Sequence, residues 1–259
     1  HNLKPELDWE FMSTSEAKEL YGKLVQSDLA DSTRAIRSRY VLNFYKYLAE
    51  EKINTNLDMN VLNKMKAHKN PPPIIDEQEI LTEDQLQNLL SQNMPEEMKT
   101  VIACLFGGGM RVSEVLNLRP ADVTFKFDEE FGRSYFRISV DDRKTQKRRT
   151  TFVVIPYLMD VIKNHMHSVK NTDEYFIMDN EQQLKYSYVR YWFDKYKYLY
   201  PKLSSHKGRK FNISHRIANG ESASTVCLTT HGAPTSPSIN HYLRLNEKDA
   251  IRGIMRNNT

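Results

Sequence analysis

Apolar side chains recur at helical spacing along much of this chain. Between residues 32 and 48 they follow a period of about 3.6 residues, which predicts an amphipathic helix with Ser32 as its N-cap. Past residue 80, Thr82 and Gln85 have the spacing of a capping box that opens another helix. The apolar stripes expected to face a core are Ile36, Tyr40, Val41, Phe44, Tyr47 and Leu48 in the first helix, and Leu86, Leu89 and Leu90 in the second.

The pattern changes twice further along the chain. An apolar helix over residues 98–106 is expected to end at the glycines 107–109, and a short helix over 112–118 follows. Residues 134–140 and 150–155 are rich in β-branched and aromatic side chains, which predicts a small β-hairpin. The helical period then returns, and this order predicts a mainly α fold with a small antiparallel sheet, of the α+β class. The later helices are expected at 157–169, 184–199, 210–219 and 246–255.

One break in composition divides the chain. The consecutive prolines Pro71, Pro72 and Pro73 cannot continue a helix and favour an extended spacer. We therefore expect a helical domain over residues 1–66, a proline-rich linker over 67–79, and a second domain over 80–259.

Composition narrows the class of protein. Of the 259 residues, 39% are hydrophobic, which is enough for a packed core, and the formal net charge of +4 fits a nucleic-acid binder without requiring one. The two cysteines are too few for a disulfide scaffold and indicate a reducing compartment. No apolar run is long enough to span a bilayer, and no signal-peptide pattern opens the sequence. We expect an intracellular protein.

The glycines at 107–109 lead directly to Arg111 and Glu114. No Lys-Ser/Thr pair follows them and no GxGxxG register is present, so neither a Walker loop nor a dinucleotide loop is predicted. A helix stop accounts for the glycines. Arg111 begins the next helix, where exposed amides also favour an anion, and Glu114 is one turn further on, where it can hold the arginine.

Basic residues gather in three further places. Five of the seven residues in the turn 143–149 are basic, as in a solubilising hairpin tip or a tip that reaches a phosphate. Residues 184–210 interleave lysines and arginines with tyrosines, which favours contact with a DNA backbone. For the first helix, a solvated basic face and contact with DNA phosphates both stay open. The residues expected to contact DNA are Arg34, Arg37, Arg143, Lys147, Arg148, Arg149, Arg190, Lys207 and Lys210.

The remaining candidates are His206, Arg209, His231 and Tyr242, each of which is ordinary when taken alone. The histidines have no carboxylate or cysteine at metal-ligand spacing, so no metal site is predicted. No GxSxG motif or Ser-His-Asp grouping indicates a hydrolase. Together with Arg111, however, these residues suit phosphoryl transfer without a metal. Guanidinium groups bind the equatorial oxygens of a phosphorane, and a tyrosine can serve as the covalent nucleophile.

These residues stand in the order found in the tyrosine recombinase (phage integrase) family, which the chain resembles over roughly residues 81–245. Residues 109–118 closely match the family's first box, which implies a supporting role for Glu114, and residues 206–209 match the second box. The N-terminal part resembles the family's helical core-binding domain. The catalytic residues that the resemblance implies are Arg111, Lys144, His206, Arg209, His231 and Tyr242.

The chain also departs from the family pattern. Gly208 stands where leucine is usual, and Lys210 stands where histidine is common. Residues 229–232 lack the usual Leu-Gly-His, and the segment from His231 to Tyr242 is slightly long and contains two prolines. These departures indicate a divergent branch, viral or carried by a mobile element.

The resemblance implies a site-specific DNA recombinase or integrase that works through a covalent 3′-phosphotyrosine. Tyr242 would attack the scissile phosphate while Arg111 and Arg209 hold its non-bridging oxygens. No metal, ATP or organic cofactor is implied. The implied partners are double-stranded DNA with specific recognition sites and further copies of the chain, from dimer to tetramer.

The proton transfers are assigned by the same resemblance. Lys144 would protonate the leaving 5′-oxygen, with Lys147 as the second candidate on the same turn. His206 would assist proton transfer, and His231 would hydrogen-bond the phosphate.

Two other functions stay open from the sequence. A type IB topoisomerase-like or telomere-resolving enzyme would use the same chemistry without joining two sites, although the short N-terminal helical domain favours a recombinase. A DNA-binding structural protein derived from the fold would not cleave at all, although the complete set of candidate residues argues against it.

Overall fold

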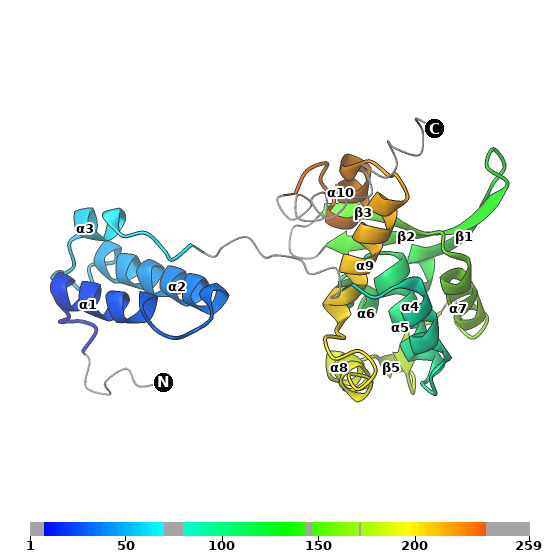
Figure 1. Ribbon diagram of the computed structural model, residues 1–259, viewed down its shortest axis with the longest axis horizontal. Coiled ribbons are helices and arrows are strands. Elements are labelled where there is room, and N and C mark those ends of the chain that lie inside the picture. The colour runs from blue at the N-terminus through cyan, green and yellow to red at the C-terminus, as the bar shows by residue number, and fades with distance from the viewer. Residues whose placement is uncertain (1–7, 70–79, 143–146, 171, 237–259) are drawn as a thin grey trace, which may run out of the picture. The chain divides into compact units, whose positions relative to one another are not determined.

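The computed structural model of the chain describes residues 8–69, 80–142, 147–170 and 172–236, except for the side chains of residues 142 and 147. It divides into two compact units, His1–Ile74 and Ile75–Thr259 (Figure 1). Each unit has its own cluster of buried apolar side chains.

Unit 1 is helical and consists of α1 (Thr14–Val25), α2 (Asp31–Glu50) and α3 (Met59–Lys64). The predicted helix is present as α2, but Ala30 is its N-cap and Ser32 lies inside the first turn. The expected buried stripe is wrong in most positions, because apolar residues occupy more than one face of α2 and only one face packs against α1. Ile36, Tyr40, Phe44 and Tyr47 are exposed, whereas the buried residues of α2 are Ala35, Ser38, Leu42, Tyr45 and Leu48.

The chain that follows α3 stays attached to unit 1. The Tyr21 hydroxyl donates to the Lys66 carbonyl at 2.7 Å, and the His68 backbone N–H donates to Ser38 Oγ at 2.9 Å. The proline run of the predicted linker lies outside the described residues.

Unit 2 contains seven described α-helices. The capping box of Thr82 and Gln85 is confirmed, because each side chain bonds the other's backbone N–H, at 3.2 and 3.0 Å. The helices are α4 (Glu83–Ser91), α5 (Glu96–Gly107), α6 (Val112–Leu116), α7 (Pro156–Met166), α8 (Tyr186–Lys195), α9 (Ser205–Ala218) and α10 (Ala223–His231).

Two of these helices differ from the sequence prediction in ways that matter for function. The helix expected from residue 210 begins at Ser205, so residues 206–209 lie in its first turns. Helix α10, which ends at His231, is not predicted by the apolar pattern, because its apolar residues do not gather on one face. The helix expected over 246–255 lies outside the described residues.

The sheet of unit 2 has three antiparallel strands in the order β1 (Val123–Asp128), β2 (Arg133–Asp142), β3 (Lys147–Val153). The predicted hairpin is confirmed as β2 and β3, with Val140 paired to Arg149 and Phe136 to Val153, and β1 extends it by a strand that was not predicted. Two further strands, β4 (Met178–Asp179) and β5 (Gln182–Gln183), form a separate small hairpin.

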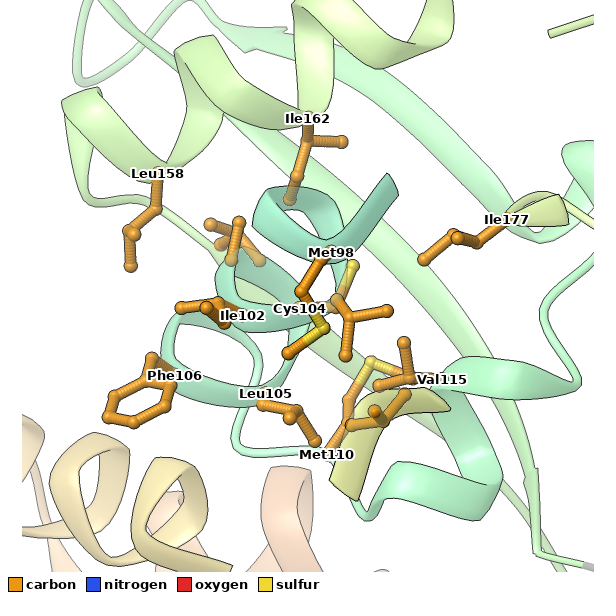
Figure 2. Packing of buried hydrophobic residues seen from close by; sticks show 14 of the residues in the cluster. Met98, Ile102, Cys104, Leu105, Phe106, Met110, Val115, Leu158, Ile162 and Ile177 are labelled. Carbon is orange, nitrogen blue, oxygen red and sulfur yellow. The ribbon is translucent and has the colours of Figure 1, made fainter. Parts of the chain in front are cut away.

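Helix α5 is the centre of unit 2. It lies between α7 and α9 (Figure 1), and its residues from Thr100 to Gly107 are all buried. Figure 2 shows Ile102 and Phe106 of α5 facing the core together with Leu158 and Ile162 of α7. A helix buried on all sides is held firmly by its neighbours. The glycine turn at its C-terminal end therefore starts from a well-defined position.

Candidate active site

The C-terminal end of α5 is anchored by side chains from two other elements. The last carbonyls of a helix lack partners within the helix. Asn212 of α9 donates from Nδ2 to the carbonyls of residues 106 and 107, at 3.2 and 2.6 Å. Thr151 of β3 donates to the carbonyl of Gly108 at 2.7 Å. The sheet and α9 thus fix the turn that leads to Arg111.

Gly109 makes this turn possible. Its φ of +59° lies in the left-handed region, and a Cβ there would stand 2.6 Å from Asn212 Oδ1. Any other residue would be strained there and would displace the Asn212 amide that binds the end of α5. Gly109, two residues before Arg111, therefore leaves room for the Asn212 side chain as well as ending the helix as predicted from the sequence.

Arg111 is held by a buried carboxylate. Glu114 Oε2 accepts the backbone N–H of Arg111 at 2.6 Å, and Oε1 accepts its guanidinium at 2.8 Å. The Glu114 side chain is 4% exposed and that of Arg111 is 46% exposed. Arg149 of β3 also donates to Glu114 Oε2, at 2.6 Å. The expectation that Glu114 holds Arg111 is thus met by a carboxylate that two arginines share.

Arg209 enters the site from α9, and its side chain is buried. Gly208 explains how this helix comes so close to α5. A Cβ on Gly208 would lie 2.8 Å from Leu105 Cβ and 2.9 Å from the Leu105 carbonyl carbon. No larger residue fits at this crossing. The glycine that departs from the family's usual leucine therefore has a packing reason in this chain.

His231 ends α10 and faces the same group of charges. The Thr230 hydroxyl donates to the Val226 carbonyl at 2.5 Å, so its lone pairs face His231 Nδ1 at 2.8 Å. That arrangement favours a proton on Nδ1 and leaves Nε2 as the acceptor of the neutral ring.

The pKa of His231 falls to about 4, first through desolvation and then through the positive charges of Arg209, Arg111 and Arg149, which the Glu114 carboxylate partly offsets. The ring is therefore uncharged at neutral pH.

His206 lies in the first turn of α9 and shares two of these arginines. Its pKa is lowered by partial desolvation and then by the positive charges of Lys210, Arg209, Lys207 and Arg111. Coulomb interactions weaken with distance and with solvent between the charges. Hydrogen bonds show that the helices meet here, because Arg149 binds both Glu114 of α6 and Thr229 of α10, and Asn212 of α9 binds the end of α5.

The basic residues predicted to contact DNA differ in exposure. Arg149 and Lys207 are buried, because Arg149 faces the inner side of β3 and Lys207 lies in a helix that begins earlier than expected. Arg34 is half-buried and donates to Asp31 and to two nearby carbonyls. The residues with larger exposure are Arg37, Arg148, Arg190 and, half-buried, Lys210.

Several predicted residues cannot be placed. Arg143, Lys144 and Tyr242 lie outside the described residues. Lys147 opens β3, but its side chain is not among those described. The proposed nucleophile and the proposed general acid therefore stay predictions from the sequence.

Two residues with a part in the site, Asn212 and Thr151, were not named from the sequence, and both anchor the glycine turn. Arg149 was named as a DNA contact, but in the structure it binds Glu114. A signal for the positions of Thr151 and Arg149 is present in the sequence. On β3, Arg149, Thr151 and Val153 alternate with outward-facing residues, so their shared inward face can be read from the period of a strand.

The family assignment comes from comparison with known proteins. The sequence model described as the phage integrase family matches residues 79–247, which is more than half of the chain. The chain therefore belongs to the phage integrase family, and it is a tyrosine recombinase by family and fold. No curated protein sequence matches it.

Solved structures of tyrosine recombinases share the fold over nearly the whole chain. The XerH site-specific recombinase bound to a difH substrate has a TM-score of 0.64 at 15% identity, covering 96% of this chain and 73% of its own. The lambda integrase dimer bound to a COC′ core site has a TM-score of 0.63 at 13% identity, covering 92% and 82%. The Tn1549 transposon integrase in complex with circular intermediate DNA has a TM-score of 0.60 at 15% identity, covering 94% and 85%.

Within the described part of the chain, no three His, Cys, Asp or Glu side chains come together as metal ligands. No helix in the same ranges has both the length and the apolar character needed to cross a bilayer.

Proposed function

We propose that this protein is a site-specific DNA recombinase or integrase that cleaves and rejoins DNA through a covalent 3′-phosphotyrosine on Tyr242. The observation that carries the proposal is the hydrogen-bonded cluster in which the buried Glu114 carboxylate binds Arg111 and Arg149, and Arg149 binds the last turn of α10. Membership of the phage integrase family supports the same chemistry. The guanidinium groups supply positive charge where the phosphorane gains negative charge.

In the cleavage step, the Tyr242 oxygen forms a bond to phosphorus while the bond from phosphorus to the 5′-oxygen breaks. Arg111 and Arg209 bind the non-bridging oxygens throughout. A 5′-hydroxyl from a second strand then attacks the phosphotyrosine and releases the tyrosine, so the energy of the broken bond is kept. No step requires a metal or an organic cofactor in this proposal.

Proton movement requires a donor for the 5′-oxygen and an acceptor for the tyrosine hydroxyl. We assign the donor to Lys144, with Lys147 as the second candidate, and we assign assistance in proton transfer to His206. In the free protein His231 presents an uncharged ring with Nε2 as its acceptor, given the contact of Nδ1 with Thr230. A hydrogen bond from Nε2 to the phosphate would therefore need DNA binding to raise the pKa of this ring.

The proposed partner is double-stranded DNA carrying specific sites. The similar structures of XerH, lambda integrase and the Tn1549 integrase are complexes with DNA. We extend this to a dimer or tetramer of the present chain on DNA. Arg37, Arg148 and Arg190 are exposed and are the proposed phosphate contacts. In the DNA-free protein, Arg148 and Arg190 pair with aspartates.

The test begins with selection of the duplexes that the protein binds from a random-sequence pool. The selected site is then built into a nicked substrate, which traps the covalent complex. Wild-type protein should form an adduct that survives a denaturing gel. Tyr242→Phe should form none and should keep its affinity for DNA, because only the nucleophilic oxygen is lost. Tyr135→Phe, which removes an equivalent hydroxyl from β2, should form the adduct at the wild-type rate.

Two results would contradict this proposal. Adduct formation by Tyr242→Phe would mean that another residue is the nucleophile, and a wild-type protein that binds DNA without ever forming an adduct would be a binding protein. Relaxation of plasmids without dependence on the selected site would instead favour a topoisomerase-like enzyme.

A further inference from the structure

Arg149 is a deeply buried charged side chain next to the site, and the reaction proposed above gives it no role. Its side chain is 4% exposed, whereas that of its neighbour Arg148 is 67% exposed and pairs with Asp141 and Asp122. Successive residues of a strand point to opposite faces. Arg149 thus points inward from β3, away from the basic outer face of the hairpin.

The two ends of the Arg149 guanidinium bind different elements. One end donates to Glu114 Oε2 at 2.6 Å, on α6, and the other donates to the backbone carbonyl of Thr229, on α10. The planar fork of an arginine suits two acceptors at a fixed separation, which a lysine ammonium cannot reproduce. Arg149 therefore bridges the helix that begins after Arg111 to the helix that ends in His231.

Thr229 is also held from its other side. The Thr229 hydroxyl accepts a hydrogen bond from the Arg216 guanidinium of α9 at 2.6 Å. Arg216 also donates two hydrogen bonds to the Glu221 carboxylate, at 2.9 and 2.5 Å. The last turn of α10 is thereby placed by β3 through one arginine and by α9 through another. His231 is two residues beyond Thr229, so its position depends on these contacts.

We infer that Arg149 is a positioning residue of the strand-cleavage site, which sets α10 and His231 relative to the Arg111–Glu114 pair. This inference rests on the proposed function. Arg149 touches no reacting atom in this assignment and acts through Glu114 and Thr229.

The alternative is that Arg149 only stabilises the fold. Glu114 already has Arg111 as a counter-ion, so a second buried arginine is not needed to neutralise it. Burying a guanidinium carries a desolvation penalty, and apolar packing at the same place is often as stable. A role in fixing geometry explains why this position carries a charge. The positive charge of Arg149 also lowers the pKa of His231, as do the charges of Arg209 and Arg111. The Glu114 carboxylate acts in the opposite direction and raises this pKa.

The experiment compares Arg149→Lys and Arg149→Met with Arg137→Lys, which changes an exposed arginine on the neighbouring strand β2. Four quantities are measured for each: the single-turnover rate of adduct formation, the affinity for the selected duplex, thermal unfolding, and the pKa of His231 by NMR in the DNA-free protein.

We expect both Arg149 variants to slow adduct formation by about 100-fold, the order of loss caused by a misplacement of about 1 Å. Their affinity for DNA should change by less than about threefold, because phosphate contacts on the surface are kept. The pKa of His231 should rise in Arg149→Met and stay low in Arg149→Lys, which keeps the charge. Arg137→Lys should match wild type in all four measurements.

A wild-type rate of adduct formation in folded Arg149→Lys would overturn the inference, as would equal losses of rate, affinity and folded protein in both variants. If Arg149→Met does not fold, the result for Arg149→Lys still tests the inference. That variant keeps a second positive charge within reach of Glu114. If wild-type protein forms no adduct, the proposed function fails. The NMR titration still reports whether Arg149 lies beside His231, so the two failures are distinguishable.

Discussion

At the scale of single residues, the site is organised by Glu114. This buried carboxylate accepts the backbone and guanidinium of Arg111 and one end of Arg149. Bonds between a carboxylate and arginine are short and directional, so each partner limits where the others can lie. The result is positive charge fixed before DNA arrives, which is how a protein stabilises a developing oxyanion most effectively.

The neutral state of His231 predicts how stability depends on pH. The pKa is about 4 in the folded protein against an ordinary value of 6.5, so the unfolded chain binds more protons between these values. The contribution of this residue to stability should therefore be fully present above the unfolded pKa of 6.5. It should be lost as the pH falls toward the folded pKa of about 4. Between about pH 7 and about pH 5 the loss from this residue should reach up to roughly 2 kcal/mol.

Urea unfolding of wild type and His231→Gln at the two pH values tests this expectation. The variant has no group to protonate at this position, so its stability should fall less over the same range. Identical losses in both proteins would show that His231 is not desolvated in the folded state.

At the scale of elements, α5 and α9 cross closely enough to bring Arg209 beside the turn that carries Arg111. The crossing depends on Gly208, which lies against the backbone and Cβ of Leu105. It also depends on Asn212, whose amide binds the end of α5. Helix packing thus controls the distance between the two guanidinium groups.

Gly208→Ala should separate these helices. The added methyl group would meet the Leu105 carbonyl, which cannot turn aside as a side chain can, and forced packing of this kind costs about 1–3 kcal/mol. Adduct formation should fall as well, because Arg209 moves with α9. Thermal unfolding and the trapping assay measure the two effects.

Gly22→Ala provides the matched control. Gly22 also lies within a helix, α1, but a Cβ there would meet nothing within 4 Å. Alanine is favoured over glycine inside helices by about 0.5–1 kcal/mol, so this variant should be slightly more stable than wild type. Equal behaviour of the two variants would show that the α5–α9 crossing is not tight.

At the scale of the whole molecule, the chain has two units with separate cores. The core of unit 1 is formed by residues between Met12 and Leu62, and the large core of unit 2 by residues between Leu81 and Phe211. Each core is closed within its own unit, so neither unit needs the other to bury its apolar side chains. Joining them in one chain raises the effective concentration of one unit near DNA bound by the other.

Residues 1–74 and 75–259, produced as separate proteins, should each unfold in a cooperative transition. Affinity for the selected duplex should be lower for an equimolar mixture than for the intact chain, by about 100-fold or more if both units bind DNA. Calorimetry and a binding titration measure these outcomes. Equal affinities for the mixture and the intact chain would mean that only one unit contributes.

Local regularities explain which parts of the architecture could be predicted from sequence. The capping box at Thr82, the end of α5 at the glycines and the hairpin of β2 and β3 all follow from chemistry within a few residues. Strand β1 was missed although Val123, Phe125 and Phe127 alternate as in a strand. Its charged residues hide the signal when the segment is read without its partner β2.

The residue types of the candidate site, and their order along the chain, are determined by the sequence alone: an arginine after a glycine turn, a histidine and arginine in a later box, and a late histidine. Only the tertiary structure decided which faces are buried and which charges meet. From the sequence, Arg149 is predicted to lie in a basic surface turn, but its side chain is buried. Ile36 is predicted to face the core, but its side chain is exposed to solvent. The reason is physical: helical and strand periods arise between near neighbours, whereas burial and ion pairing depend on elements far apart in the chain.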